Sequence, residues 1–251
     1  MNESLSKDEI LLCERLRSLK MSGMADAFEA QLMDPNADLS PFMERFSAIV
    51  NNEWQIRYNK KFNRMLKKAH LRYPDADLDE TVYDPARKLD TVTIERLATC
   101  HWIDEGKNLL ITGMTSSGKT YLSNALCISA LRQMKTVLYI RANILLLELE
   151  QARLKSTYLE YVTDLSRLDL LAIDDFGLME FDLDKCRDLF NVIDSREGRK
   201  STIIISQFPV KSWFDLFKEH TYADACLARI TDKRHSYRLE MNGISMREAD
   251  R

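Results

Sequence analysis

The chain contains 251 residues, and its hydrophobic fraction of 45% is sufficient for one large core or two modest ones. Its net charge of −3 gives by itself no indication of a nucleic-acid partner. The five cysteines show neither a C-x-x-C pair nor zinc-ligand spacing, which is typical of reduced thiols in a cytosolic protein. The first eight residues lack the apolar core of a secretion signal, and no apolar run approaches the roughly 18 residues of a membrane helix. We therefore expect a cytoplasmic protein without a membrane partner.

Helical periodicity dominates the first part of the chain. Apolar spacing predicts one helix from residue 6 or 7 to residue 20 and another over residues 24–33. Residues 36–40 form a break, and Pro41 suits the first turn of the helix that follows.

Residues 53–72 are predicted to form one long amphipathic helix with a cationic outer face. At about 100° per residue, its apolar side chains fall in an arc of roughly 120° and its basic side chains in a separate arc of roughly 140°. Glu53 is the single acid of this stretch. The basic residues are Arg57, Lys60, Lys61, Arg64, Lys67, Lys68 and Arg72.

Three interpretations of this cationic face remain open: a solvated helix surface, a membrane-surface helix, and a track along a nucleic-acid phosphate backbone. The near absence of compensating acids favours the phosphate backbone. We expect the apolar face to be needed for packing, which argues against membrane binding. We expect all seven basic residues to contact DNA.

An acidic segment with two prolines, residues 74–85, is typical of a connector. We therefore expect a helical DNA-binding domain over residues 1–73, a connector over 74–92 and an α/β domain over 93–251. In that last domain, after a helix at 93–103, strands expected at 108–112, 136–140, 169–174 and 202–206 alternate with helices at 120–134, 143–155 and 183–195. Such alternation predicts a mainly parallel sheet covered by helices on both faces. Further helical pieces are expected at 211–217, 222–230 and from 245 onward.

The stretch GMTSSGKT, from Gly113 to Thr120, fits the phosphate-binding loop pattern G-x-x-x-x-G-K-[ST]. It lies between a predicted strand and a predicted helix, where backbone N–H groups and the helix N-terminus favour a bound phosphate. A polar turn capping a helix is the alternative. Lys119 is expected to neutralise β- and γ-phosphate oxygens of ATP, and Thr120 to bind Mg²⁺. The predicted nucleotide-binding residues are Gly113, Thr115, Ser116, Ser117, Gly118, Lys119, Thr120 and Tyr121.

A second strand end supports this site. The apolar run 168–173 ends in Asp174 and Asp175, which a parallel sheet would place beside the phosphate loop. We expect Asp174 to bind Mg²⁺ and Asp175 to polarise the attacking water. An acidic strand end leading into a turn is the alternative. Gln207 follows the strand 202–206, at a position suited to sensing the γ-phosphate or holding the water.

Taken in order, these segments resemble the IstB-type transposition helper ATPases and, more distantly, the DnaC helicase loaders and DnaA initiators of the AAA+ class. The resemblance is carried by residues 15–27, 66–78, 113–120, 170–177, 202–207, 223–230 and 243–247. It implies a P-loop AAA+ ATPase with a parallel sheet flanked by helices, preceded by a small all-helical domain. Few residues follow Arg229, so any lid must be reduced.

The resemblance also implies roles for individual residues. Gln207 matches the sensor-1 residue, and Arg229 matches the arginine finger that reaches the nucleotide of a neighbouring subunit. Arg247 matches sensor 2, which contacts the γ-phosphate in its own subunit. A finger used between subunits implies an ATP-dependent homo-oligomer. Two departures are Ser116, where many such loops have glycine, and Asp175, where glutamate is commoner.

The function expected from these features is an ATPase that uses ATP and Mg²⁺ to assemble on double-stranded DNA. It would remodel that DNA and select or deliver it to a cognate transposase. The alternatives are a DnaC-like replicative helicase loader acting on single-stranded DNA, and a nucleotide-gated adaptor with negligible turnover. A small-molecule P-loop kinase would have no use for the basic helix.

Overall fold

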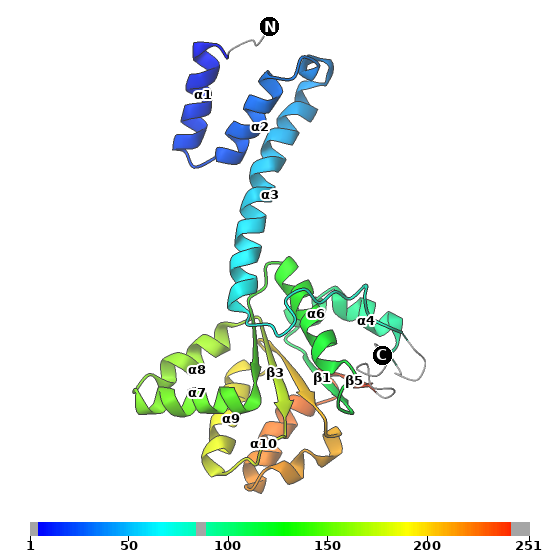
Figure 1. Ribbon diagram of the computed structural model, residues 1–251. Coiled ribbons are helices and arrows are strands. Elements are labelled where there is room, and N and C mark those ends of the chain that lie inside the picture. The colour runs from blue at the N-terminus through cyan, green and yellow to red at the C-terminus, as the bar shows by residue number, and fades with distance from the viewer. Residues whose placement is uncertain (1–4, 84–88, 242–251) are drawn as a thin grey trace. The chain divides into compact units, whose positions relative to one another are not determined.

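The computed structural model describes residues 5–83 and 89–241 (Figure 1). The chain divides into two compact units, one ending at Arg64 and the other beginning at Met65. The sequence placed the connector at 74–92, whereas residues 65–83 belong to the second unit. Arg247 and the helix expected from residue 245 lie outside the described residues.

The first unit is helical, as expected. Helix α1 spans Lys7–Ser18, and Ser6 and Glu9 form a reciprocal capping box at its start. Helix α2 spans Ser22–Leu32 and is followed by a 3₁₀ turn, η1, over Ala37–Leu39. Helix α3 begins at Phe42, directly after Pro41, and ends at Lys68. It is therefore longer than expected at its start and ends four residues before Arg72.

A buried carboxylate joins the helices of this unit. Glu53 accepts a hydrogen bond from the Met24 backbone N–H at 3.2 Å and pairs with Arg57 at 2.5 Å. Arg57 also donates to the Lys20 carbonyl at 2.8 Å. The pKa of Glu53 is lowered because these partners outweigh the opposing effect of its burial. Arg57 thus stabilises the packing of this unit.

The second unit is built on a five-stranded parallel sheet with the order β2-β3-β4-β1-β5. The strands are β1 (Asn108–Gly113), β2 (Val137–Arg141), β3 (Leu170–Phe176), β4 (Ser201–Ser206) and β5 (Ser236–Met241). The first four confirm the predicted strands. Strand β5, at the sheet edge, was not predicted, although Ser236–Met241 alternates polar and apolar residues as half-exposed strands do.

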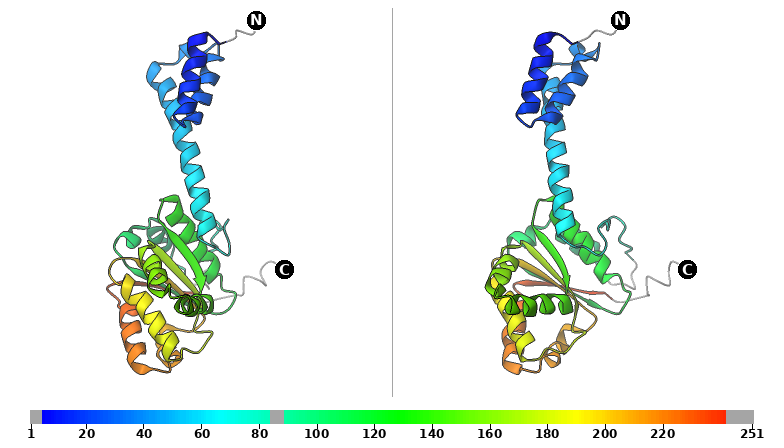
Figure 2. Two further views of the ribbon diagram at one scale, coloured as in Figure 1. Left: turned by 90° about the vertical axis from the view of Figure 1, so that its left-hand side faces the viewer. Right: turned by 60° about the vertical axis from the view of Figure 1, so that its left-hand side comes forward.

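Helices cover both faces of this sheet (Figures 1 and 2). One face carries α4 (Thr91–Ala98), α5 (His101–Asp104) and α6 (Lys119–Arg132). The other carries α7 (Ala142–Leu154), α8 (Tyr158–Arg167), α9 (Leu183–Arg196) and α10 (His220–Thr231). Leu171, Ile173 and Ile204 are fully buried in the core on this second side. The expected α/β fold with a parallel sheet is confirmed.

Some helices differ from the prediction. The helix expected at 93–103 is broken at Cys100, whose φ of 57° starts the short α5. Helix α8 was not predicted, although its apolar residues recur with helical spacing. Residues 211–217 form two 3₁₀ turns, η3 (Val210–Ser212) and η4 (Phe214–Leu216), and no α-helix. None of the helices in the described ranges has both the length and the apolarity required to cross a membrane.

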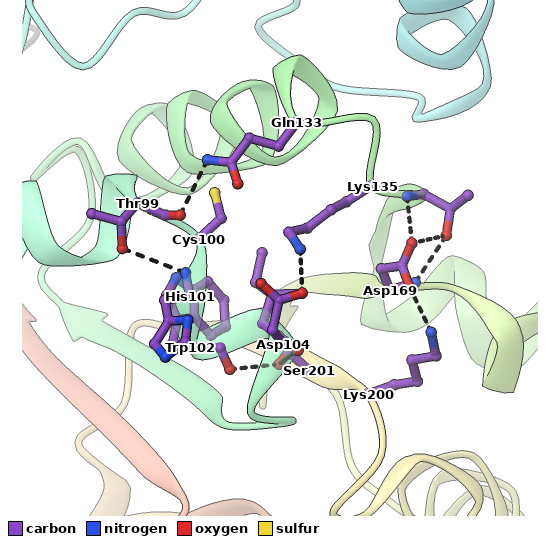
Figure 3. A network of polar contacts seen from close by, with 12 residues as sticks. Thr99, Cys100, His101, Trp102, Asp104, Gln133, Lys135, Asp169, Lys200 and Ser201 are labelled. Atoms are coloured by element: carbon purple, nitrogen blue, oxygen red, sulfur yellow. Dashed lines mark hydrogen bonds and ion pairs between the residues drawn. The ribbon is translucent and has the colours of Figure 1, made fainter.

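Polar contacts hold the amino ends of the strands in place (Figure 3). The Asp169 carboxylate accepts hydrogen bonds from the backbone and hydroxyl of Thr136, both at 2.8 Å. It also pairs with Lys200 at 2.5 Å, just ahead of β4. Lys135 pairs with Asp104 at the end of α5. These contacts fix the amino ends of the strands. In folds of this type, ligands bind at the opposite, carboxyl ends.

Candidate nucleotide-binding site

A pocket of about 640 Å³ lies at the carboxyl ends of β1, β3 and β4. Nine residues predicted from the sequence line it: Thr115, Ser116, Gly118, Lys119, Thr120, Tyr121, Asp174, Asp175 and Gln207. The remaining lining residues come from β4, from the start of α6 and from residues 72–82. This one pocket therefore contains both sequence segments from which nucleotide binding was inferred.

The phosphate loop has the backbone that the motif requires. Ser116 and Gly118 have positive φ values, 64° and 86°, and α6 begins at Lys119. The Lys119 ammonium is buried inside the loop and donates to the Met114 carbonyl at 2.6 Å. Burial lowers the pKa of Lys119, although Asp174 and Asp175 oppose this shift. A bound phosphate would offset the cost of burying this charge.

Gly113 has a second structural reason to be glycine. Its φ is 148°, and an added Cβ would lie 2.0 Å from the carbonyl oxygen of Met241. Met241 ends β5, which pairs with β1 along its whole length. The neighbouring strand therefore excludes any side chain at the start of the loop.

Asp174 is the carboxylate of the pocket that accepts the most hydrogen bonds. It is buried, and its Oδ2 accepts hydrogen bonds from Thr120 Oγ1 at 2.8 Å and from the Tyr139 hydroxyl at 2.6 Å. Its Oδ1 accepts the backbone N–H of Asp175 at 2.7 Å. Burial, together with the hydrogen bond to Asp174, raises the pKa of Tyr139, so its hydroxyl remains protonated and donates. The carboxylate is thereby held facing the Thr120 hydroxyl.

Asp175 lies in a strained and less crowded position. Its φ of 56° is in the left-handed region, which is uncommon for non-glycine residues and costs some backbone strain. Burial raises the pKa of Asp175, and the Asp174 carboxylate adds to this shift. Arg141 Nε lies 3.7 Å from its Oδ2. Arg141, Arg72 and Lys119 all lower the pKa of Asp175 and so oppose the increase.

Gln207 directly follows β4, and its Oε1 accepts a hydrogen bond from Thr115 Oγ1 at 2.7 Å. This contact places an amide at the edge of the phosphate loop. The hydrogen bond connects the loop after β1, which was predicted to bind phosphate, with the residue after β4, which was predicted to sense the γ-phosphate.

Arg229 does not line the pocket. It lies on α10, where it pairs with Asp194 on α9 at 2.9 Å and with Glu197, the residue after α9, at 3.0 Å. Its guanidinium also lies 4.9 Å from the centre of the Phe190 ring. The side chain is thus held on the surface of its own subunit, and its expected role at a neighbouring nucleotide stays a prediction.

The predicted DNA-binding residues fall into three groups. Lys60, Lys61, Arg64, Lys67 and Lys68 are exposed on α3, and none of them makes an ion pair with a described residue. Arg57 is engaged with Glu53. Arg72 lies beyond the helix end and lines the pocket.

The sequence interpretation missed Tyr139, Arg141 and the pocket wall formed by residues 72–82. A signal existed for the two β2 residues, because side chains two apart on a strand share a face. In the parallel register, Tyr139 is opposite Ala172 and Arg141 is opposite Asp174. No comparable signal marked the wall, because its acids and its proline are typical of a connector.

Comparisons with known proteins agree with this geometry. Residues 14–251 match the family described as IstB-like ATP binding protein. An insertion sequence ATP-binding protein of Sinorhizobium fredii is 35% identical over 232 residues, covering 92% of each chain. The AMPPCP-bound DnaA of Aquifex aeolicus has a similar fold, with a TM-score of 0.58 and 18% identity over 69% of this chain and 51% of that chain. The DnaC helicase loader gives a TM-score of 0.52 and 19% identity over 68% of this chain and 99% of that chain.

Proposed function

The chain belongs to the IstB-like ATP-binding proteins, and on this basis we propose that it is an AAA+ ATPase that delivers duplex DNA to a partner transposase. The observation that carries the proposal is the convergence of Lys119, Thr120, Asp174, Asp175 and Gln207 on one pocket. The insertion-sequence context of its relative supports a role in transposition.

The pocket residues are suited to Mg²⁺ as well as ATP. Thr120 Oγ1 and Asp174 Oδ2 lie 2.8 Å apart, and oxygen ligands of this kind are the ones Mg²⁺ prefers. We propose that these two residues hold the ion, which neutralises charge on the phosphates when bound. Tyr139 keeps the carboxylate in position.

Hydrolysis needs a base beside the γ-phosphate, and Asp175 is the candidate. It follows Asp174 directly, lines the pocket and is less constrained than its neighbour. Lys119 would hold the β- and γ-oxygens while Gln207 contacts the γ-phosphate. Arg229 of one subunit would complete the site of the next, which makes assembly and hydrolysis interdependent.

We propose that DNA binds along α3. Its exposed residues Lys60, Lys61 and Arg64 are free of described ion pairs and can neutralise phosphates of the backbone. Phosphate contacts of this kind position a protein on DNA without reading its sequence. In this proposal the α3 surface binds DNA, and the second unit binds and hydrolyses ATP.

The test is duplex affinity over a salt series, with a non-hydrolysable ATP analogue present. Changing Lys60, Lys61 and Arg64 together to alanine should lower the slope of log affinity against log salt by roughly 2–3, because each phosphate contact contributes about 0.9. The loss should be similar on unrelated sequences. A variant with Lys7, Arg15 and Lys20 changed to alanine removes the same charge from the same unit and should keep the slope.

An unchanged slope in the α3 variant would overturn the proposed DNA surface. Tighter binding to single strands than to duplex would favour the helicase-loader alternative.

A further inference from the structure

Arg72 lies at a position that its sequence context did not predict. It follows helix α3 by four residues, after a turn at His70, whose φ is 52°. Two hydrogen bonds fix the backbone around it. The Ala69 carbonyl accepts the N–H of Tyr139 on β2 at 2.8 Å, and the Tyr73 N–H donates to Asn124 Oδ1 on α6 at 2.9 Å. Arg72 is thus anchored to the sheet on one side and to α6 on the other.

The side chain of Arg72 belongs to the pocket. It lines the cavity together with Lys119, Asp174 and Asp175, and its guanidinium lies 5.6 Å from the centre of the Tyr73 ring. The positive charge of Arg72 lowers the pKa of Asp175, the proposed base, which agrees with a position near that carboxylate. No ion pair joins Arg72 to a carboxylate in the parts of the chain that the structure describes.

The charges of the pocket show which ligand this arginine suits. Asp174 is committed to Thr120 and Tyr139, while Asp175 lies beside Arg141. Arg72 therefore keeps its donors for a ligand, and guanidinium groups match the geometry of phosphate oxygens. Because it lies with the two carboxylates, the phosphate it would meet is the terminal one.

We propose that Arg72 binds the γ-phosphate of ATP in its own subunit and so links helix α3 to the nucleotide state. The inference rests on the proposed function of the pocket. It moves Arg72 from the DNA-binding set to the nucleotide site. Only three residues separate Arg72 from the end of α3. A change in the contacts of Arg72 on nucleotide binding would therefore alter the position of the end of the basic helix.

The experiment compares Arg72→Ala with wild type by calorimetric binding of a non-hydrolysable ATP analogue and of ADP. Loss of a hydrogen bond to a charged group in a partly exposed position should weaken the ATP analogue by about tenfold and ADP by less than about twofold. Arg72→Lys keeps the charge but not the fork of donors, so it should recover only part of the loss. Lys155→Ala, an exposed charge in the same unit that does not line the pocket, is the control.

A second arm measures the salt dependence of duplex binding for Arg72→Ala and Lys68→Ala. If Arg72 belonged to the DNA-contacting set, both variants would lower the slope equally, and Arg72→Ala would bind both nucleotides normally. That result would overturn the inference, as would equal weakening of ATP analogue and ADP. If wild type bound neither nucleotide, the proposed function itself would fail.

Discussion

Replacing Tyr139 with phenylalanine removes the hydroxyl that donates to Asp174, a residue of the proposed magnesium site. The ring stays in place, so the packing of β2 is preserved. What is lost is the 2.6 Å hydrogen bond to Asp174 Oδ2, one of the three contacts that orient this carboxylate. Hydrogen bonds to charged groups contribute about 1.5–3 kcal/mol, and loss of a group that hydrogen-bonds a metal ligand typically weakens metal binding by about 10- to 100-fold.

We therefore expect Tyr139→Phe to need at least about tenfold more Mg²⁺ for half-saturation. The assay is a titration of free Mg²⁺ at fixed ADP, read as the increase in thermal unfolding temperature and, separately, as ATP turnover. Tyr161→Phe is a matched control, because its hydroxyl donates to Glu148 on α7 and it does not line the pocket. If Tyr139→Phe and Tyr161→Phe showed the same Mg²⁺ dependence as wild type, Tyr139 would be a packing residue and the reasoning would fail.

Three further outcomes are expected. Lys119→Ala should lose ATP binding, whereas Asp175→Asn should bind ATP and not hydrolyse it; a fully active Asp175→Asn protein would move the base elsewhere. Because burial and Asp174 raise the pKa of Asp175, its proton is held to higher pH, so the acid limb of the wild-type turnover profile should lie above the ordinary value of 3.8. Arg229→Ala should bind ATP without turnover, and its mixture with Asp175→Asn should regain activity. The control Asp194→Asn loses an ion pair to Arg229 but keeps the arginine, so it should stay active. Inactivity of every mixture would refute the role of Arg229 as an arginine finger.

Much of the fold could be predicted because periodicity and strand ends follow directly from burial. The apolar runs that became β1, β3 and β4 are buried on both faces, which a parallel sheet requires. The phosphate loop and the two aspartates could be found for the same reason, since the loop follows β1 and the aspartates lie near the carboxyl end of β3. Strand β5 was overlooked, although its alternation of polar and apolar residues is the pattern of a half-exposed strand.

Arg72 shows where periodicity misleads. Its position at about 100° per residue continues the basic arc of α3, but the helix ends at Lys68 and the chain turns at His70. The contacts that decide its place come from Tyr139 and Asn124, which are distant in sequence. Local pattern contains no information on such partners, so the pocket wall emerged only with the tertiary structure.

The hydrogen bond between the Ala69 carbonyl and Tyr139 bears on where the protein can be truncated. Strand β2 lies at the edge of the sheet, and the Ala69 carbonyl accepts the N–H of Tyr139 on that edge. A fragment of the second unit that begins at Met65 keeps this contact, while one that begins at Pro74 exposes the N–H of Tyr139 on an open edge that can pair with other chains. The shorter fragment should therefore aggregate more readily during expression, although both contain the whole phosphate loop.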